Sequence, residues 1–222
     1  MENVLQFLKD LALNNNREWF NDNRRRYEES RNKILFITEL IIHEIHKFDP
    51  DVPIMNPKDC MFRIFRDIRF SKDKRPYKTN FGAFIAKGGR KSKYAGYYIH
   101  IEPGMSFAGG GIYMPPADSL KAIRMQIDQH PHEFVQIISD DQFQSWFAEM
   151  FDHKLKTAPK GFPKDHKYIE WLKYKSYAFS TPLKDNVVTD EKFLGYTLDA
   201  FRQLYKINSF LNQAVKNNEG NI

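Results

Sequence analysis

Two strand-like stretches that flank Pro103-Gly104 constrain the fold of this chain more than any other feature. Residues 94–102 and 105–113 are rich in the aromatic and β-branched residues that favour strands. The proline and glycine between them suit the two central positions of a tight turn. Residues 81–87 carry a similar pattern just upstream. We therefore predict an antiparallel meander in the middle of the chain.

Helical patterns lie on both sides of this predicted meander. Apolar residues recur at helical spacing over residues 4–11 and 17–47, and again in the last thirty or so positions. Asn15 and Glu18 have the spacing of a capping box for the second helix, and Thr189 is expected to cap the last one. Residues 61–65 and 174–179 are predicted as further strands.

This order of elements predicts the fold class. Strands cluster in the middle and helices at the ends, which is typical of an α+β fold with an antiparallel sheet covered by long N- and C-terminal helices. We found no repeat or long linker, and we expect a single α+β domain over residues 1–222, with a frayed tail at residues 216–222.

The cysteine content and the N-terminus bear on location. Cys60 is the single cysteine, so no intrachain disulfide can form, and a reducing compartment fits best. The N-terminus lacks the pattern of a signal peptide, and no apolar run is long enough to cross a bilayer. We expect a cytoplasmic protein that does not insert into a membrane.

The positive charge of the chain is concentrated in one segment. Residues 63–93 contain eleven Lys and Arg and two Asp, a balance of +9, whereas the whole chain carries +6. The rest of the chain is therefore slightly acidic, at −3. Such a distribution favours local recognition of an anion over general coating of nucleic acid.

Within this segment, residues 63–78 are the candidate binding site. Guanidinium groups offer forked donors that match phosphate and carboxylate oxygens, and an aspartate can orient one of them in a bidentate pair. A lysine, a tyrosine and a second lysine follow in a loop stiffened by Pro76. The candidate anion-binding residues are Arg63, Arg66, Asp67, Arg69, Lys74, Tyr77 and Lys78.

Two other interpretations of this segment remain open. The charges can form a structural network in which Asp67 and Asp73 pair with basic neighbours. Alternatively, the segment serves a nucleic-acid-binding or assembly module together with the basic residues 87–93. Affinity that falls steeply with salt is the mark of that alternative.

His100 is the candidate for proton transfer, should the protein be an enzyme. Tyr98, His100 and Glu102 alternate along a predicted strand and so share one face. A histidine with a nearby carboxylate suits a base and its orienting partner, and it also suits two metal ligands. No HxxxH or CxxC spacing lies nearby, so we expect no metal, and the sequence assigns no cofactor.

The glycine-rich runs exclude two nucleotide-binding motifs. Neither residues 88–93 nor residues 108–111 have the spacing of a P-loop or of GxGxxG before a helix. The run at 108–111 is more typical of a strand packed closely under a helix, or of a bulge. Cys60 is expected to be a buried, unreactive thiol.

The motif itself resembles a known family. The pattern Arg63-x-x-Arg66-Asp67-x-Arg69-Phe70, followed by Asp73-Lys74-x-x-Tyr77, is similar to the signature of the bacterial family called domain of unknown function 2461. Residues 76–82, 100–104 and 109–115 also resemble that family. The resemblance implies that Arg63, Arg66, Asp67, Arg69, Lys74 and Tyr77 belong to the defining motif. It implies no activity.

Together these patterns predict a protein that binds an anionic small molecule bearing phosphate or carboxylate, in a pocket lined by residues 63–78. A hydrolase or transferase activity is compatible with the residues. The sequence assigns no reaction and no oligomeric state.

Overall fold

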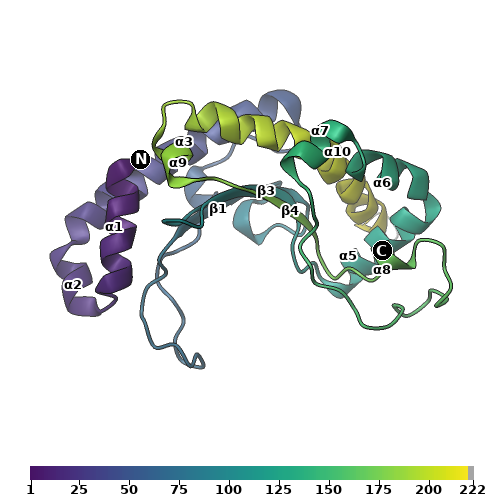
Figure 1. Cartoon of the computed structure of the whole chain (residues 1–222), viewed down its shortest axis with the longest axis horizontal. Coiled ribbons are helices and arrows are strands. Elements are labelled where there is room, and N and C mark those ends of the chain that lie inside the picture. The colour runs from purple at the N-terminus through teal and green to yellow at the C-terminus, as the bar shows by residue number, and fades with distance from the viewer. Residues whose placement is uncertain (220–222) are drawn as a thin grey trace. The chain divides into compact units, whose positions relative to one another are not determined.

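The computed structural model describes residues 1–219, and within them four strands form one antiparallel sheet (Figure 1). The strand order is β1-β2-β3-β4, with bounds Phe81–Ile85, Gly96–Ile101, Phe107–Ile112 and Tyr177–Pro182. Because β1, β2 and β3 are consecutive neighbours, the predicted meander is confirmed.

Helices occupy both ends of the described chain and the stretch between β3 and β4, so the α+β class is also confirmed. Before β2 come α1 (Glu2–Leu13), α2 (Arg17–Asp22), α3 (Arg24–Phe48), α4 (Pro57–Cys60) and the short 3-10 helix η1 (Gly89–Lys91). The later helices are α5 (Ala117–Gln129), α6 (Pro131–Ile138), α7 (Asp141–Trp146), α8 (Ile169–Leu172), α9 (Asp185–Thr189) and α10 (Phe193–Glu219).

Contacts between Cα atoms divide the chain into two compact units. The first unit contains Met1–Arg90, Tyr98–Ala108 and Pro182–Asp199, and the second contains the rest of the described chain. This division gives no test of independent folding, so the single domain stays a prediction. All the candidate residues named above lie in the first unit.

The core of the first unit lies where α1 and α3 pack together and where α3 meets β1. One face of α3 is buried through Ile34, Ile41 and Ile45, which recur at helical spacing. Aromatic rings fill the space around Phe7: its ring lies 6.1–6.5 Å from the rings of four neighbours, namely Trp19, Phe20, Tyr27 and Phe81.

The core of the second unit forms around α10. Tyr97 and Phe201 pack ring to ring at 5.3 Å, and both are fully buried. A Cβ atom at Gly110 would lie 2.7 Å from Leu204 Cδ1 on α10 and 2.5 Å from the Gly96 carbonyl oxygen. Glycine is therefore required at this position because β3 passes close under the helix, as the sequence predicted for this run.

The predicted long second helix is wrong at its start. It is interrupted at Asn23, which separates α2 from α3 with φ −102° and ψ 17°. The Asn23 side chain donates to the Trp19 carbonyl and accepts from Arg26, and such local bonds compete with a continuous helix. The predicted capping residue is also wrong by one position, because Asn16, not Asn15, accepts from the Trp19 N–H.

Three further predictions need correction. Residues 61–65 form no regular strand, only isolated bridges from Met61 to Ala83 and from Phe65 to Tyr77. Thr189 ends α9 instead of capping α10, because its hydroxyl donates back to the Asp185 carbonyl at 3.0 Å. Of the tail expected to fray, residues 216–219 belong to α10, and residues 220–222 lie outside the described residues.

Candidate functional site

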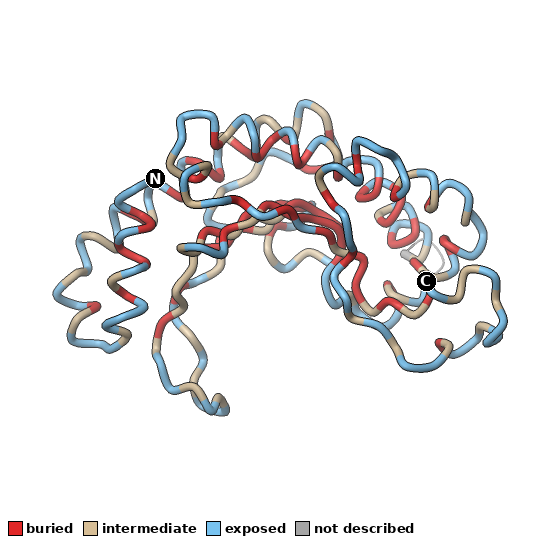
Figure 2. Tube along the Cα trace, viewed as in Figure 1, coloured by how far each residue is buried: buried red, intermediate tan, exposed pale blue. Residues whose placement is uncertain are grey.

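Residues 61–80 form an extended arm that leaves the sheet before β1 and doubles back to it (Figure 1). Its two limbs are joined by backbone bonds: the Arg66 N–H donates to Pro76 at 2.9 Å, and the Lys78 N–H donates to Ile64 at 2.8 Å. Figure 2 shows the far end of this arm as exposed and intermediate residues, whereas the sheet is mostly buried. The arm therefore presents side chains to solvent on a paired backbone.

Tyr77 anchors the arm to the body of the first unit. The residue is 5% exposed, and its ring stacks on Phe20 with centroids 3.9 Å apart and an interplanar angle of 10°. The Asn15 side chain holds the Tyr77 backbone from both sides, donating to its carbonyl at 3.0 Å and accepting from its N–H at 3.1 Å. Burial raises the pKa of Tyr77. Tyr77, which the sequence analysis named as a candidate anion-binding residue, is thus a buried residue that holds the arm on the first unit.

Several candidate cations are paired inside the arm. Arg66 Nη1 and Arg75 Nη2 both contact Asp73 Oδ2, at 2.5 and 2.7 Å. Hydrogen bonds from Arg75, then from Arg66, hold the pKa of Asp73 well below its usual value. These pairs match the structural network that the sequence left open as an alternative.

The outer part of the arm is paired in the same way. Arg69 makes a bidentate pair with Asp67, at 3.0 Å from Nε and 2.7 Å from Nη2. These bonds lower the pKa of Asp67. Lys74 Nζ donates to the Ile68 carbonyl at 3.1 Å and so ties the two limbs together. Arg66, Asp67, Arg69 and Lys74 therefore all have partners within the arm.

Arg63 and Lys78 differ from these paired residues, and we call them the root pair. Within the described chain, neither side chain makes a hydrogen bond or an ion pair with a carboxylate. Lys78 is half-buried, with its ammonium 5.5 Å from the centre of the Phe62 ring. Burial lowers the pKa of Lys78, and the nearby charges of Arg63 and Arg66 lower it further. The charge of Arg63 does act on the Asp67 carboxylate and helps to lower its pKa, but Asp67 is bonded to Arg69. The root pair thus carries two positive charges without a directly bonded carboxylate.

A chain of four polar residues, which we call the His100 network, connects the arm to β2. Tyr98 and His100 lie in β2, Glu102 follows it, and Thr79 is next to Lys78 in the arm. Thr79 donates to Glu102 Oε1 at 2.5 Å, and Glu102 Oε2 lies 3.0 Å from His100 Nε2. His100 Nδ1 lies 3.1 Å from the Tyr98 hydroxyl. The side chains of His100 and Glu102 are 13% and 16% exposed, so the network is mostly buried but still accessible to solvent.

The donors and acceptors of the network follow from its chemistry. An ionised carboxylate only accepts, so His100 Nε2–H donates to Glu102, and in the neutral ring Nδ1 is left to accept from the Tyr98 hydroxyl. Burial and the nearby Glu102 charge raise the pKa of Tyr98 to about 12, which keeps its hydroxyl protonated. This arrangement orients the imidazole of His100 through its carboxylate partner, a geometry compatible with general acid–base chemistry.

Ring contacts link the root pair to the His100 network. The Phe62 ring, which lies under Lys78, meets the Tyr98 ring edge-on at 6.1 Å and 73°. Phe107 stacks on His100 at 4.7 Å and 14°. Gly82 makes room for this arrangement, because a Cβ atom there would lie 2.4 Å from the Tyr98 hydroxyl. A cationic patch, aromatic surface and an oriented histidine thus lie in one part of the first unit.

The buried Cys60 does not add a reactive group to the described residues. Burial raises the pKa of Cys60 to about 12, so its thiol stays protonated and unreactive. No cluster of three or more His, Cys, Asp or Glu within residues 1–219 has the geometry to hold a metal ion. No helix in the same part of the chain is long and apolar enough to cross a membrane.

A cavity of about 500 Å³ in the first unit lies away from these residues. Its walls come from α1, α3 and α9, and include Gln6, Arg26, Lys33 and Thr189. The arm does not line this cavity, so the root pair is not part of it.

Sequence reasoning missed three residues that shape this site. Asn15 anchors the arm from 62 positions away, and no local pattern signals such a contact. The predicted strand over residues 61–65 hides the role of Phe62, and Thr79 entered only as part of the family resemblance of residues 76–82. The sequence does show the alternation of Tyr98, His100 and Glu102. That pattern is the signal from which a polar partner such as Thr79 could have been sought in the arm.

Comparison with known proteins gives a family and no function. A family model described as "Conserved hypothetical protein (DUF2461)" matches residues 3–210, which include the arm and the His100 network. Comparisons with curated proteins and with solved structures gave no match.

Proposed function

The chain belongs to the DUF2461 family, and we propose that it binds an anionic small molecule at the root pair, Arg63 and Lys78. The observation that carries this proposal is the contrast within the arm. Arg66, Arg69 and Arg75 each contact an aspartate directly, whereas among the described residues neither member of the root pair makes an ion pair with a carboxylate. A bound anion would supply the missing negative charge.

Electrostatics supports this assignment. Burial disfavours the charged form of Lys78 and lowers its pKa, and the nearby guanidinium groups of Arg63 and Arg66 lower it further. A phosphate or carboxylate would accept hydrogen bonds from both members of the root pair, and such charge-assisted bonds are stronger than neutral ones. Hydrogen bonds from Arg63 and Lys78 to a neutral ligand would be weaker.

The surroundings narrow the class of ligand. Phe62 lies beside Lys78 and also contacts Tyr98, so a flat or apolar group attached to the anion has an aromatic surface to pack on. We therefore favour a phosphorylated or carboxylated compound that carries a ring. The single buried cysteine fits a reducing compartment, and we include a cytoplasmic location in the proposal.

His100 extends the proposal to a hydrolytic or transfer step. Its orientation by Glu102 and its bond to Tyr98 suit a group that moves a proton to or from a bound ligand. In such a step Glu102 would orient His100 and stabilise its charged form, and the root pair would hold the anionic group.

Calorimetric titration with inorganic phosphate, sugar phosphates and nucleotides tests the binding proposal. Lys78→Met and Arg63→Met should each weaken binding by about tenfold or more, because each removes one charge-assisted bond. Arg69→Met is the matched control, since Arg69 lies on the same arm but is already paired with Asp67. If none of these ligands bound, or if all three variants lost affinity equally, the root pair would not be the site.

A further inference from the structure

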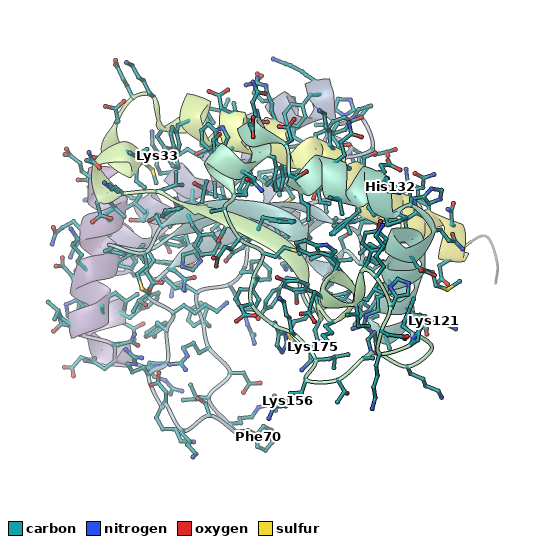
Figure 3. The ribbon with its side chains drawn as sticks, turned by 45° about the vertical axis from the view of Figure 1, so that its right-hand side comes forward. Lys33, Phe70, Lys121, His132, Lys156 and Lys175 are labelled. Carbon is teal, nitrogen blue, oxygen red and sulfur yellow. The ribbon has the colours of Figure 1, made fainter. Side chains whose placement is uncertain are left out.

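The far end of the arm carries an exposed aromatic side chain. Phe70 is 96% exposed, and Figure 3 shows its ring at the end of the arm, pointing into solvent. The Arg69 guanidinium lies 5.9 Å from the centre of this ring. We propose that the tip of the arm, residues 67–75, binds single-stranded nucleic acid by stacking a base on Phe70.

The charges around Phe70 suit a phosphate backbone. Arg69, Lys72, Lys74 and Arg75 outnumber the two aspartates of the tip. Lys72 makes no hydrogen bond or ion pair with any described residue, so its ammonium is available to a phosphate. A basic surface that follows the backbone, combined with rings on which bases stack, is the usual design of proteins that bind single strands.

The tip is held in shape before any ligand arrives. Arg69 is fixed by its bidentate pair with Asp67, and Lys74 ties the limbs together through the Ile68 carbonyl. The buried Tyr77 anchors the other end of the arm. Such preorganisation lowers the entropy that a protein loses on binding. The backbone that carries Phe70 is therefore held in place by the contacts of its neighbours.

A single strand fits these features better than two other anionic partners. In a duplex the bases are already stacked on one another, so an exposed ring has no free base face to cover. Between residues 67 and 75, Phe70 is the only large hydrophobic side chain that is exposed. Binding to a membrane depends on the apolar area that is buried, and one ring offers little. One ring is sufficient to stack on a single base.

This inference does not depend on the proposed function. The root pair lies at the base of the arm and would hold a small anion, whereas Phe70 lies at its far end. Substitutions at the tip should leave phosphate binding at the root pair unchanged, and Lys78→Met should leave base stacking on Phe70 unchanged. The two proposals can therefore fail separately.

The test uses fluorescence anisotropy with a labelled oligothymidylate of about 12 nucleotides, within the range of single-strand site sizes. Phe70→Ala should weaken binding by about tenfold, and Phe70→Trp should restore it. Phe70→Leu should behave like alanine, because leucine is apolar but has no ring. The matched control is Phe36→Ala: Phe36 is 53% exposed on α3, and Lys33 lies 5.9 Å from its ring.

Salt and competing partners complete the design. Lys72→Met should lower the slope of log affinity against log salt by about 0.7 for each phosphate that Lys72 neutralises. A duplex of the same length and vesicles containing phosphatidylserine serve as competitors. The proposal is overturned if the oligothymidylate does not bind, if Phe70→Leu binds like wild type, or if the duplex or the vesicles bind more tightly than the single strand.

Discussion

Lys78 is a residue whose contribution to stability and to binding should have opposite signs. Its lowered pKa means that the folded chain holds this proton less tightly than the unfolded chain. Stability therefore rises with pH between the lowered pKa and the ordinary value of 10.5, and the penalty is fully present at neutral pH. Residues that serve a ligand commonly carry such a cost.

Lys78→Met should accordingly stabilise the protein. Methionine keeps much of the length that packs on Phe62 but carries no charge. After allowance for solvent screening, the gain in the free energy of unfolding at neutral pH should be at most about 1 kcal/mol. Urea denaturation at neutral pH and near pH 10.5 measures it. A variant less stable than wild type at neutral pH would show that Lys78 has a structural partner.

Gly82 tests the packing of the His100 network. Alanine there would place a Cβ atom 2.4 Å from the Tyr98 hydroxyl, so the ring must move away and its bond to His100 must lengthen. We expect Gly82→Ala to lower the free energy of unfolding by about 1–3 kcal/mol. Gly195→Ala is the control, because no atom lies within 4 Å of the added Cβ in α10, and it should stabilise by about 0.5–1 kcal/mol.

Thermal unfolding of both variants, followed by circular dichroism, gives the comparison. Equal effects of the two substitutions would mean that the close approach of Tyr98 to Gly82 carries no cost.

At the residue level, the sequence located the candidate cations but not their partners. The surplus of charge in residues 63–93 was visible from composition alone. Which cations are compensated depends on where the chain doubles back, since Arg66 meets Asp73 only across the two limbs. No local spacing encodes that meeting, so the root pair could not be separated from its paired neighbours in advance.

The arm is the element on which both proposals depend, and Asn15 connects it to the helical body. Its side chain bonds both the N–H and the carbonyl of the buried Tyr77. Asn15→Ala would leave both groups unsatisfied, at a cost of about 1–3 kcal/mol. We expect faster amide hydrogen exchange in residues 64–78 and faster tryptic cleavage there.

Asn14→Ala is the matched control, because within the described chain the Asn14 side chain donates only to the carbonyl of Asp10 in the preceding helix α1 and makes no hydrogen bond with the arm. Unchanged exchange in the arm of Asn15→Ala would contradict an anchoring role for this side chain.

The elements that sequence reasoning predicted well are those with local signals. The meander follows from strand patterns and from the turn at Pro103-Gly104, where Gly104 has φ +73°. The arm was predicted less well because its limbs are joined by isolated bridges and long-range contacts, not by a regular ladder. The break at Asn23 was missed because apolar periodicity continues through it, while its side-chain bonds are not visible in the sequence.

At the scale of the whole molecule, several carboxylates are held in the ionised form by basic neighbours. The pKa values of Asp10, Asp67, Asp73 and Glu170 are all lowered, mainly by hydrogen bonds from arginine or lysine. A carboxyl with a lowered folded pKa contributes stability above its ordinary pKa and loses that contribution as the pH falls further.

We therefore expect stability to be level near neutral pH and to fall as the pH drops below about 4. The urea midpoint measured at a series of pH values checks this expectation. These carboxylates are mostly solvent-exposed, so added salt should reduce the effect. A midpoint that rises on acidification would contradict the assigned pairs.

The central claim is that the root pair lacks a directly bonded counter-ion, which a bound anion supplies. The most direct measurement is the pKa of Lys78, followed by NMR of its ¹³Cε resonance with and without inorganic phosphate. Without phosphate we predict a pKa below 10.5, and with saturating phosphate we predict that it rises. An ordinary pKa in the unliganded protein, or no change on adding phosphate, would contradict the claim.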